Sequence, residues 1–189
     1  IQKLYETISI PTHQKKIWIH CASLGEFEQG RPIIESLSNT YPDAFIVVTF
    51  FSPSGYEVRK HYTVADVVMY MDYDTSAKAN QFVNWLQPDL AIFVKYEFWY
   101  HHLKALHKSG AQTIFIGTIF QERHPFFKWY GALHRKMLTY IDYIFVQDQH
   151  SIDLLKQISI THCTIAGDPR FDQAKTTAAL PFEDAIIKQ

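Results

Sequence analysis

Short apolar segments, many of them β-branched, alternate along this chain with segments in which apolar residues have helical spacing. The apolar segments predict strands at residues 17–21, 44–51, 67–71, 90–94, 112–117, 143–147 and 163–167. Continuous apolar runs are typical of strands that are buried on both faces of a parallel sheet. Because helical segments separate them, the pattern indicates right-handed βαβ units. We therefore predict an α/β fold with a Rossmann-like, doubly wound and mostly parallel sheet.

The helical segments follow the predicted strands in turn. They lie at about 33–41, from Tyr56 onward, and at 76–86, 99–108, 126–140 and 151–158. Pro32 limits where the first helix can begin, because proline is tolerated in a first turn but kinks a helix interior. We assign residues 1–173 to one Rossmann-like domain, and 174–189 to a linker or the start of a further domain.

Composition narrows the class of protein. Apolar residues make up 47% of the chain, which is enough to bury a core, and the formal net charge of −1 argues against a general electrostatic nucleic-acid binder. No window approaches about 20 uninterrupted apolar residues, so we expect no membrane span. Cys21 and Cys163 both lie in apolar runs, which is typical of reduced, buried thiols.

Candidate site residues follow the predicted strands, because ligands of open α/β sheets bind beyond the carboxyl ends of the strands. Ser23, Gly25 and Glu26 follow the first strand; Ser52, Ser54 and Gly55 follow the second; Glu97 follows the fourth; Gln121 and Arg123 follow the fifth; Arg170 follows the seventh. Loops are polar in general, but two glutamates within largely aromatic loops are less ordinary.

Several site classes fit the sequence poorly. The segment "SLGEFEQG" lacks the glycine spacing of a dinucleotide-binding turn, and its glutamates would repel a pyrophosphate. There is no Walker motif, and Ser23 lacks the preceding glycine of a nucleophile elbow. His101 and His102 project in different directions from a helix, so we predict no metal site and expect the histidines to face solvent or lie at helix ends.

Four segments in order resemble one known family. "HCASLGEFEQGRPIIESL", "VVTFFSPSGYE", "PDLAIFVKYEFWYHHL" and "IAGDPRFDQ" are together similar to the N-terminal domain of the 3-deoxy-D-manno-octulosonic acid (Kdo) transferases, the lipid A glycosyltransferases of Gram-negative lipopolysaccharide synthesis. The resemblance covers roughly residues 15–173.

The resemblance implies a two-lobed glycosyltransferase-B fold, of which this chain is the N-terminal lobe. That lobe would take a lipid A precursor as acceptor, and a C-terminal lobe absent from this chain would bind the donor CMP-Kdo. The implied reaction inverts the anomeric centre and uses no metal or other cofactor. The full protein would be held by an N-terminal helix on the cytoplasmic face of the inner membrane, whereas this fragment would be soluble and inactive alone.

The resemblance also assigns roles to residues. The glutamate of the family's S-x-G-E motif, its proposed general base, corresponds to Glu26, and the acid of a T-E-x-W-P segment corresponds to Glu97. Tyr100 and His101 replace the Pro-Asn of many members, and an arginine common after the fifth strand is absent or shifted to Arg123. Arg170 is expected at the hinge or the nucleotide side. The remaining candidates would contact substrate.

Physical chemistry offers two interpretations of Glu26. A carboxylate that takes the proton of a sugar hydroxyl accelerates transfer by ~10²–10⁴-fold, and Gly25 would let the chain turn tightly so that Glu26 faces the cleft. Glu26 could instead be a first-turn acid that complements the helix dipole. The dipole would weaken it as a base, whereas a nearby Glu97 would strengthen it by like-charge repulsion. Glu28 is expected to be a solvated helix residue.

Two further features stay open at this stage. Residues 124–138 combine aromatic and basic residues, which suits a peripheral contact with a membrane surface or a phosphorylated acceptor, but also suits aromatics packed on the sheet. Phe50 and Phe51 could line an acceptor slot, although aromatic residues of strands are more often part of the core. The alternative function is a non-catalytic, flavodoxin-like module that binds a ligand or partner.

Overall fold

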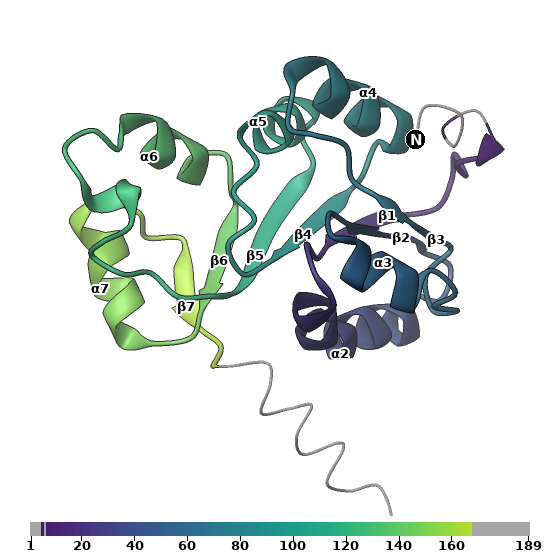
Figure 1. Ribbon diagram of the computed structural model, residues 1–189, viewed down its shortest axis with the longest axis horizontal. Helices are drawn as coiled ribbons and strands as arrows, with labels where there is room; N and C mark the ends of the chain where they lie inside the picture. Colours follow the sequence, from purple (N-terminus) through teal and green to yellow (C-terminus); the bar gives the residue numbers. More distant parts are fainter. Residues whose placement is uncertain (1–4, 6, 168–189) are drawn as a thin grey trace, which may run out of the picture.

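All seven predicted strands pair into one parallel sheet in the order β3-β2-β1-β4-β5-β6-β7 (Figure 1). The computed structural model describes residues 5 and 7–167. The strands are β1 (Lys16–His20), β2 (Phe45–Phe50), β3 (Val67–Tyr70), β4 (Leu90–Val94), β5 (Gln112–Thr118), β6 (Tyr143–Val146) and β7 (Cys163–Ile165). The predicted strands are confirmed, with their ends shifted by up to two residues.

Helices cover both faces of the sheet. They are α2 (Leu24–Thr40), α3 (Pro53–Arg59), α4 (Ser76–Leu86), α5 (Tyr100–Ser109), the 3₁₀ helix η1 (Pro125–Phe127), α6 (Ala132–Leu138) and α7 (Gln149–Gln157). In Figure 1, α2 and α3 lie side by side on one face, whereas α4 and α5 lie together on the other. No helix in the described part of the chain is both long and apolar enough to cross a membrane.

The strand order reverses direction at β1. The chain moves outward from β1 to β2 and β3, then returns to place β4 on the other side of β1. The pairs Ile17–Leu90 and His20–Phe93 hold β1 and β4 in register, so their carboxyl ends meet at one edge. In doubly wound sheets such a reversal opens a crevice where ligands bind.

The apolar core lies on both faces of the central strands. On one face Trp18 packs against Phe82 and Phe93, with ring centroids 4.6 and 5.1 Å away. On the other face Phe27 of α2 packs against Phe50 of β2. These rings are almost completely buried, so the central strands are fixed from both sides.

Helix α2 begins earlier than the sequence indicated. It starts at Leu24, and Pro32 lies in its interior, so the expectation that Pro32 limits the start of this helix is wrong. Proline removes one backbone donor from a helix. The buried face formed by Phe27, Gly30 and Ile34 packs on the sheet and outweighs that loss.

The prediction of one continuous helix over residues 126–140 is wrong. η1 and α6 replace it, with a turn between them. A side chain at Gly131 would overlap the carbonyl of Pro125, so glycine lets the chain fold back on itself there. Arg135 then donates hydrogen bonds to the carbonyl oxygens of Phe126 and Lys128, at 3.0 and 2.8 Å, and secures the turn.

Two glycines near the sheet edge give a matched test of this packing. A Cβ at Gly55 would overlap the buried ring of Phe50, whereas a Cβ at Gly25 meets nothing within 4 Å. We expect Gly55→Ala to lower the free energy of unfolding by roughly 1–3 kcal/mol. Gly25→Ala should leave it unchanged or raise it by less than about 1 kcal/mol. Urea unfolding followed by circular dichroism measures both, and equal values for the two variants would contradict the packing.

Candidate functional site

The loops that follow β1, β2 and β4 meet at the reversal point. The carbonyl oxygen of Ala22 accepts hydrogen bonds from the backbone N–H groups of Phe51 (3.3 Å) and Ser52 (2.7 Å), which ties the first loop to the second. The chain after β4 then supplies Glu97 to the same edge, where its charge acts on Glu26. Three loops that are distant in sequence therefore build one surface.

Glu26 is the third residue of α2, and its carboxylate bends back toward the start of the helix. It accepts a hydrogen bond from the N–H of Ser23 at 3.2 Å, so it also helps to cap α2. Burial raises the pKa of Glu26 to about 6, and the negative charge of Glu97 adds to the rise. Hydrogen bonds from Ala22 and Ser23 and the charge of Lys95 oppose the rise without cancelling it.

Gly25 does not make the tight turn that the sequence suggested. It is the second residue of α2, and it is not among the glycines with a positive φ. Its exposed face has open space where a side chain would be. The helix start itself, rather than a glycine turn, therefore presents Glu26.

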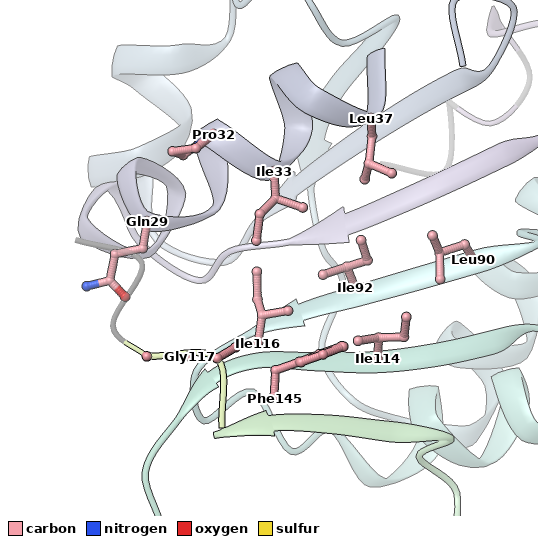
Figure 2. Close-up of a pocket in the computed structure, with 12 residues that line it drawn as sticks. Gln29, Pro32, Ile33, Leu37, Leu90, Ile92, Ile114, Ile116, Gly117 and Phe145 are labelled. Carbon is pink, nitrogen blue, oxygen red and sulfur yellow. The ribbon is translucent and has the colours of Figure 1, made fainter. Parts of the chain in front are cut away.

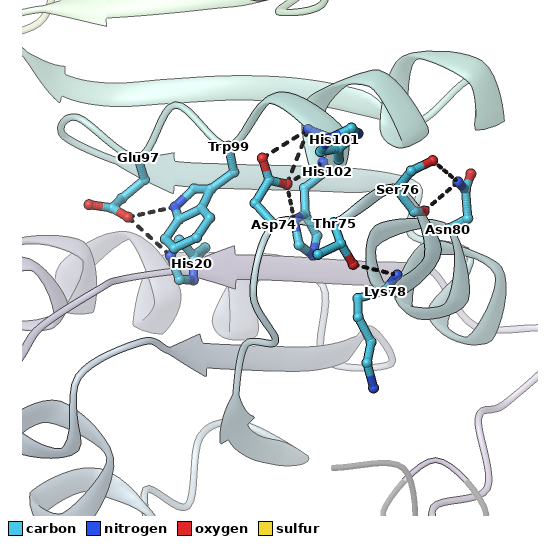
Figure 3. A network of polar contacts seen from close by, with 10 residues as sticks. All are labelled: His20, Asp74, Thr75, Ser76, Lys78, Asn80, Glu97, Trp99, His101 and His102. Carbon is cyan, nitrogen blue, oxygen red and sulfur yellow. Dashed lines mark hydrogen bonds and ion pairs between the residues drawn. The ribbon is translucent and has the colours of Figure 1, made fainter.

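Glu97 is held by two donors that act on the same oxygen (Figure 3). The indole Nε1–H of Trp99 donates to Oε2 at 2.6 Å, and Nε2 of His20 lies 3.3 Å from that oxygen. The Glu97 side chain is 15% exposed, whereas His20 is fully buried at the end of β1. Burial lowers the pKa of His20, although the hydrogen bond and charge of Glu97 oppose this.

A third carboxylate, that of Asp74 in the loop after β3, caps the start of α5. It accepts hydrogen bonds from the backbone N–H groups of His101 and His102, and its Oδ1 lies 2.8 Å from Nδ1 of His102. Burial alone would raise the pKa of Asp74, but these hydrogen bonds hold it below its ordinary value.

The histidine expectation is wrong for His20, which is fully buried at the end of β1, whereas His102 lies in the first turn of α5 as expected but is also fully buried. Among the described residues no three His, Cys, Asp or Glu side chains gather in a way that could hold a metal ion. Cys21 and Cys163 are both free thiols; Cys21 is buried as expected, whereas Cys163 is only partly buried. Glu28 is not simply solvated, because it pairs with Arg31 and Arg59.

The candidates after β2 start a helix. Ser52 is the N-cap of α3 and accepts a hydrogen bond from the N–H of Ser54, and the two hydroxyl oxygens are 2.9 Å apart. Gly55 packs on Phe50. The hydrogen bond from the N–H of Ser52 to the carbonyl oxygen of Ala22 places this helix start next to the loop that precedes Glu26.

The candidates after β5 lie in a different neighbourhood. The N–H of Gln121 donates to Nδ1 of His124 at 3.3 Å, and the His124 ring contacts Tyr96. Arg123 is exposed, and its charge acts on Tyr96 and His124. No recorded contact joins them to Glu26 in the described residues. Arg170 lies outside the described part of the chain.

Sequence reasoning missed several residues of this site. Lys95 directly follows β4 with a φ of +66°, and its charge faces Glu26. His20 and Trp99 contact the carboxylate of Glu97, and Thr49 in turn contacts His20. The positions of His20 at the end of β1 and Lys95 directly after β4 could have indicated that they belong to the site. Nothing in the sequence indicates that Thr49 contacts His20.

A separate apolar groove of about 360 Å³ lies on the face of the sheet that carries α2 (Figure 2). Ile33 and Leu37 of α2 form one wall, and Ile92, Ile114 and Phe145 of the strands form the floor. Neither Glu26 nor Glu97 lines it, so the groove is not where these carboxylates act.

Removing the charge of Glu97 tests the coupling of the two glutamates. We expect Glu97→Gln to move the pKa of Glu26 from about 6 toward its ordinary value, because a like charge is lost. Carboxyl ¹³C NMR titration measures this. Glu57→Gln, on the exposed side of α3, is the matched control and should leave the titration of Glu26 unchanged. An unchanged titration in Glu97→Gln would show that the two groups do not interact.

Comparison with known proteins identifies the family of this chain. Residues 2–173 match the family model of the N-terminal part of 3-deoxy-D-manno-octulosonic-acid transferase (kdotransferase). The 3-deoxy-D-manno-octulosonic acid transferase of Chlamydia muridarum is 29% identical over 147 residues, which are 76% of this chain and 34% of that protein. The Haemophilus influenzae transferase of the same name is 36% identical over 97 residues, or 50% of this chain and 22% of that protein.

A solved UDP-N-acetylglucosamine 2-epimerase superposes with a TM-score of 0.66 at 14% identity, covering 92% of this chain and 54% of that chain. This likeness concerns the fold alone, and it confirms the predicted N-terminal half of a glycosyltransferase-B-like architecture. The chain spans about a third of the length of the Chlamydia relative. Because the family model matches most of its length, the chain belongs to the Kdo transferase family and corresponds to the N-terminal domain of these glycosyltransferases.

Proposed function

We propose that this chain is the acceptor-side half of an inverting, metal-independent glycosyltransferase that moves Kdo from CMP-Kdo to a lipid A precursor. In this proposal Glu26 is the general base, and the donor is bound by a second lobe. The observation that carries it is the half-buried carboxylate of Glu26, with a pKa raised to about 6 at the sheet reversal, in a member of the Kdo transferase family.

The raised pKa suits proton transfer near neutral pH. A base works best when its pKa lies near the operating pH, because it is then deprotonated but still binds a proton well. Glu26 takes the proton of the acceptor hydroxyl while the hydroxyl oxygen forms a bond to the anomeric carbon of Kdo. The bond from that carbon to the CMP phosphate breaks on the opposite face, and CMP leaves with the electron pair. One base is sufficient, and the configuration inverts.

The two interpretations of Glu26 are compatible in this geometry. The carboxylate caps α2 through Ser23, as a first-turn acid does. A capping role alone would lower its pKa, because N–H groups stabilise the charged form. Burial and Glu97 instead raise the pKa, so the carboxylate is held in place and still remains basic.

In this proposal, exposed aromatic rings near Glu97 form a surface that contacts the acceptor. Phe51 is 40% exposed and Tyr73 is 75% exposed. The ring of Phe51 lies 4.9 Å from that of Trp99 and 5.9 Å from that of Tyr73, centroid to centroid. Such rings can cover the apolar face of a sugar while Ser52 and Ser54 offer hydroxyl groups. Gln121 and Arg123 extend the polar rim away from the carboxylates.

Replacing the base tests the reaction. In the complete gene product that carries this chain, we expect Glu26→Gln to lower kcat for Kdo transfer by at least ~10²-fold, because the amide cannot accept the proton. Glu35→Gln, on an exposed part of the same helix, is the matched control and should keep kcat within about twofold, since in the described part of the chain Glu35 contacts only Arg31 and the hydroxyl of Tyr62 at the surface. Product formation is followed with CMP-Kdo and a lipid A precursor. Near-normal turnover in Glu26→Gln would rule out Glu26 as the base, whereas no transfer by the unaltered complete protein would favour the binding-module alternative.

A membrane-facing surface accompanies the proposal. Trp129, Tyr130 and Leu133 are exposed by 92%, 58% and 55%, in the turn between η1 and α6 and in α6 itself. Lys128 and Lys136 lie in the same segment. Phe126 is buried and Arg135 holds the turn, so only part of the 124–138 segment is free for lipid. Exposed aromatics beside lysines suit an anionic lipid surface, on the cytoplasmic face of the inner membrane in this proposal.

Neutralising the two lysines tests this contact. Lys128→Gln with Lys136→Gln should reduce co-sedimentation with anionic liposomes by roughly tenfold or more, since each lysine near such a surface contributes about 1 kcal/mol. Lys60→Gln with Lys78→Gln, on α3 and α4, removes the same charge elsewhere and should have little effect. Equal loss in both double variants would point to net charge rather than to this surface.

A further inference from the structure

A chain of buried polar groups runs through the apolar core and ends at Glu97. Nε1–H of Trp18 donates to the hydroxyl oxygen of Thr49 at 2.8 Å, and that oxygen lies 2.9 Å from Nδ1 of His20. Nε2 of His20 then faces Oε2 of Glu97 at 3.3 Å. Trp18, His20 and Thr49 are fully buried.

The direction of these hydrogen bonds assigns the proton on His20. The carboxylate of Glu97 only accepts hydrogen bonds, so Nε2 of His20, which faces it, carries the ring proton. Nδ1 then accepts from the hydroxyl of Thr49, whose oxygen accepts from Trp18. Burial keeps the ring neutral by lowering the pKa of His20, so the ring supplies one N–H donor and no charge.

A chain of polar groups is energetically unfavourable in an apolar core. Buried polar groups destabilise the fold unless each finds a partner, and an apolar residue in place of His20 would avoid that requirement. The ring does pack well, at 5.8 Å from both Phe93 and Trp99, but its two nitrogens serve only to link Thr49 to Glu97. The buried chain of hydrogen bonds therefore determines the position of Glu97.

We propose that His20 is a positioning residue, which together with the indole of Trp99 fixes the carboxylate of Glu97 beside Glu26 while the acceptor hydroxyl loses its proton. This inference rests on the proposed function, in which Glu26 takes that proton. His20 itself lies beneath Glu97 and is not placed to touch substrate.

The charged and titratable groups around Glu26 define what the loss of His20 would do. Glu97 faces it with a negative charge and Lys95 with a positive one, while Ala22 and Ser23 offer N–H groups. Cys21 lies in the same neighbourhood, because the charges of both glutamates add to the rise in its pKa that burial causes. If Glu97 turns outward, the opposing negative charge is lost and the cation and N–H groups remain. The pKa of Glu26 then falls.

Two amide substitutions at His20 separate positioning from packing. The amide nitrogen of glutamine lies near the place of Nε2, whereas that of asparagine lies near the place of Nδ1. His20→Gln can still donate to Glu97. His20→Asn can contact Thr49 but cannot reach Glu97. Both variants remove the ring from the core, and asparagine leaves a cavity larger by one methylene, so thermal unfolding is measured for each variant to give its packing loss.

The pH dependence of kcat/KM in the complete gene product is the first readout. In His20→Asn we expect the acidic limb to move to lower pH by roughly 0.5–1 unit and kcat at neutral pH to fall about tenfold, because a weaker and less fixed base results. In His20→Gln the limb should stay in place and most of kcat should return. Equal behaviour of the two variants, or an unmoved limb in His20→Asn, would overturn the proposal.

Carboxyl ¹³C NMR titration of this chain gives a second readout that does not depend on turnover. The Glu26 midpoint should fall in His20→Asn and remain in His20→Gln. Glu26→Gln, assayed alongside, separates the two proposals. If that variant stays active the general-base function fails, while the titration still decides whether His20 positions Glu97. If it is inactive and the midpoint is the same in all His20 variants, only the positioning role fails.

Discussion

The pairing of β1 with β4 reverses the direction in which the chain crosses the sheet, and it brings together two loops about seventy residues apart. His20 ends β1 and lies in register with Phe93 of β4. Glu26 follows the first of these strands and Glu97 follows the second. Without this pairing neither the hydrogen bond from His20 to Glu97 nor the charge coupling of the two glutamates would exist. The crevice of a doubly wound sheet therefore coincides here with its two carboxylates.

The pKa of Glu26 results from effects that oppose one another. The start of α2 and Lys95 favour the charged form, while burial and Glu97 disfavour it, and the second pair prevails. A carboxylate on an exposed helix start would feel only the first pair and would be a weak base. Partial burial of the helix start against neighbouring loops makes the difference. The same hydrogen bond from Ser23 that caps the helix also keeps the carboxylate from rotating away.

The carboxylates and the apolar groove divide the surface into two regions of different character. The groove between α2 and β4–β6 is lined almost entirely by aliphatic and aromatic side chains. The carboxyl edge carries acids, hydroxyl groups and exposed aromatic rings. The exposed turn around Trp129 is a third surface, formed because Gly131 lets η1 and α6 fold against each other.

The sequence by itself determined the seven strands and the parallel α/β class, and it predicted the edge of the sheet on which Glu26 and Glu97 lie. Those features depend on local apolar periodicity and on the rule that ligands meet the carboxyl ends of strands. It also identified Glu26 and Glu97, since their motifs are contiguous. Only the tertiary structure decided that α2 runs through Pro32, that Gly25 is helical, and that His20, Thr49 and Trp99 support Glu97. These outcomes depend on packing against distant residues and on the strand order, and neither is encoded within any one segment.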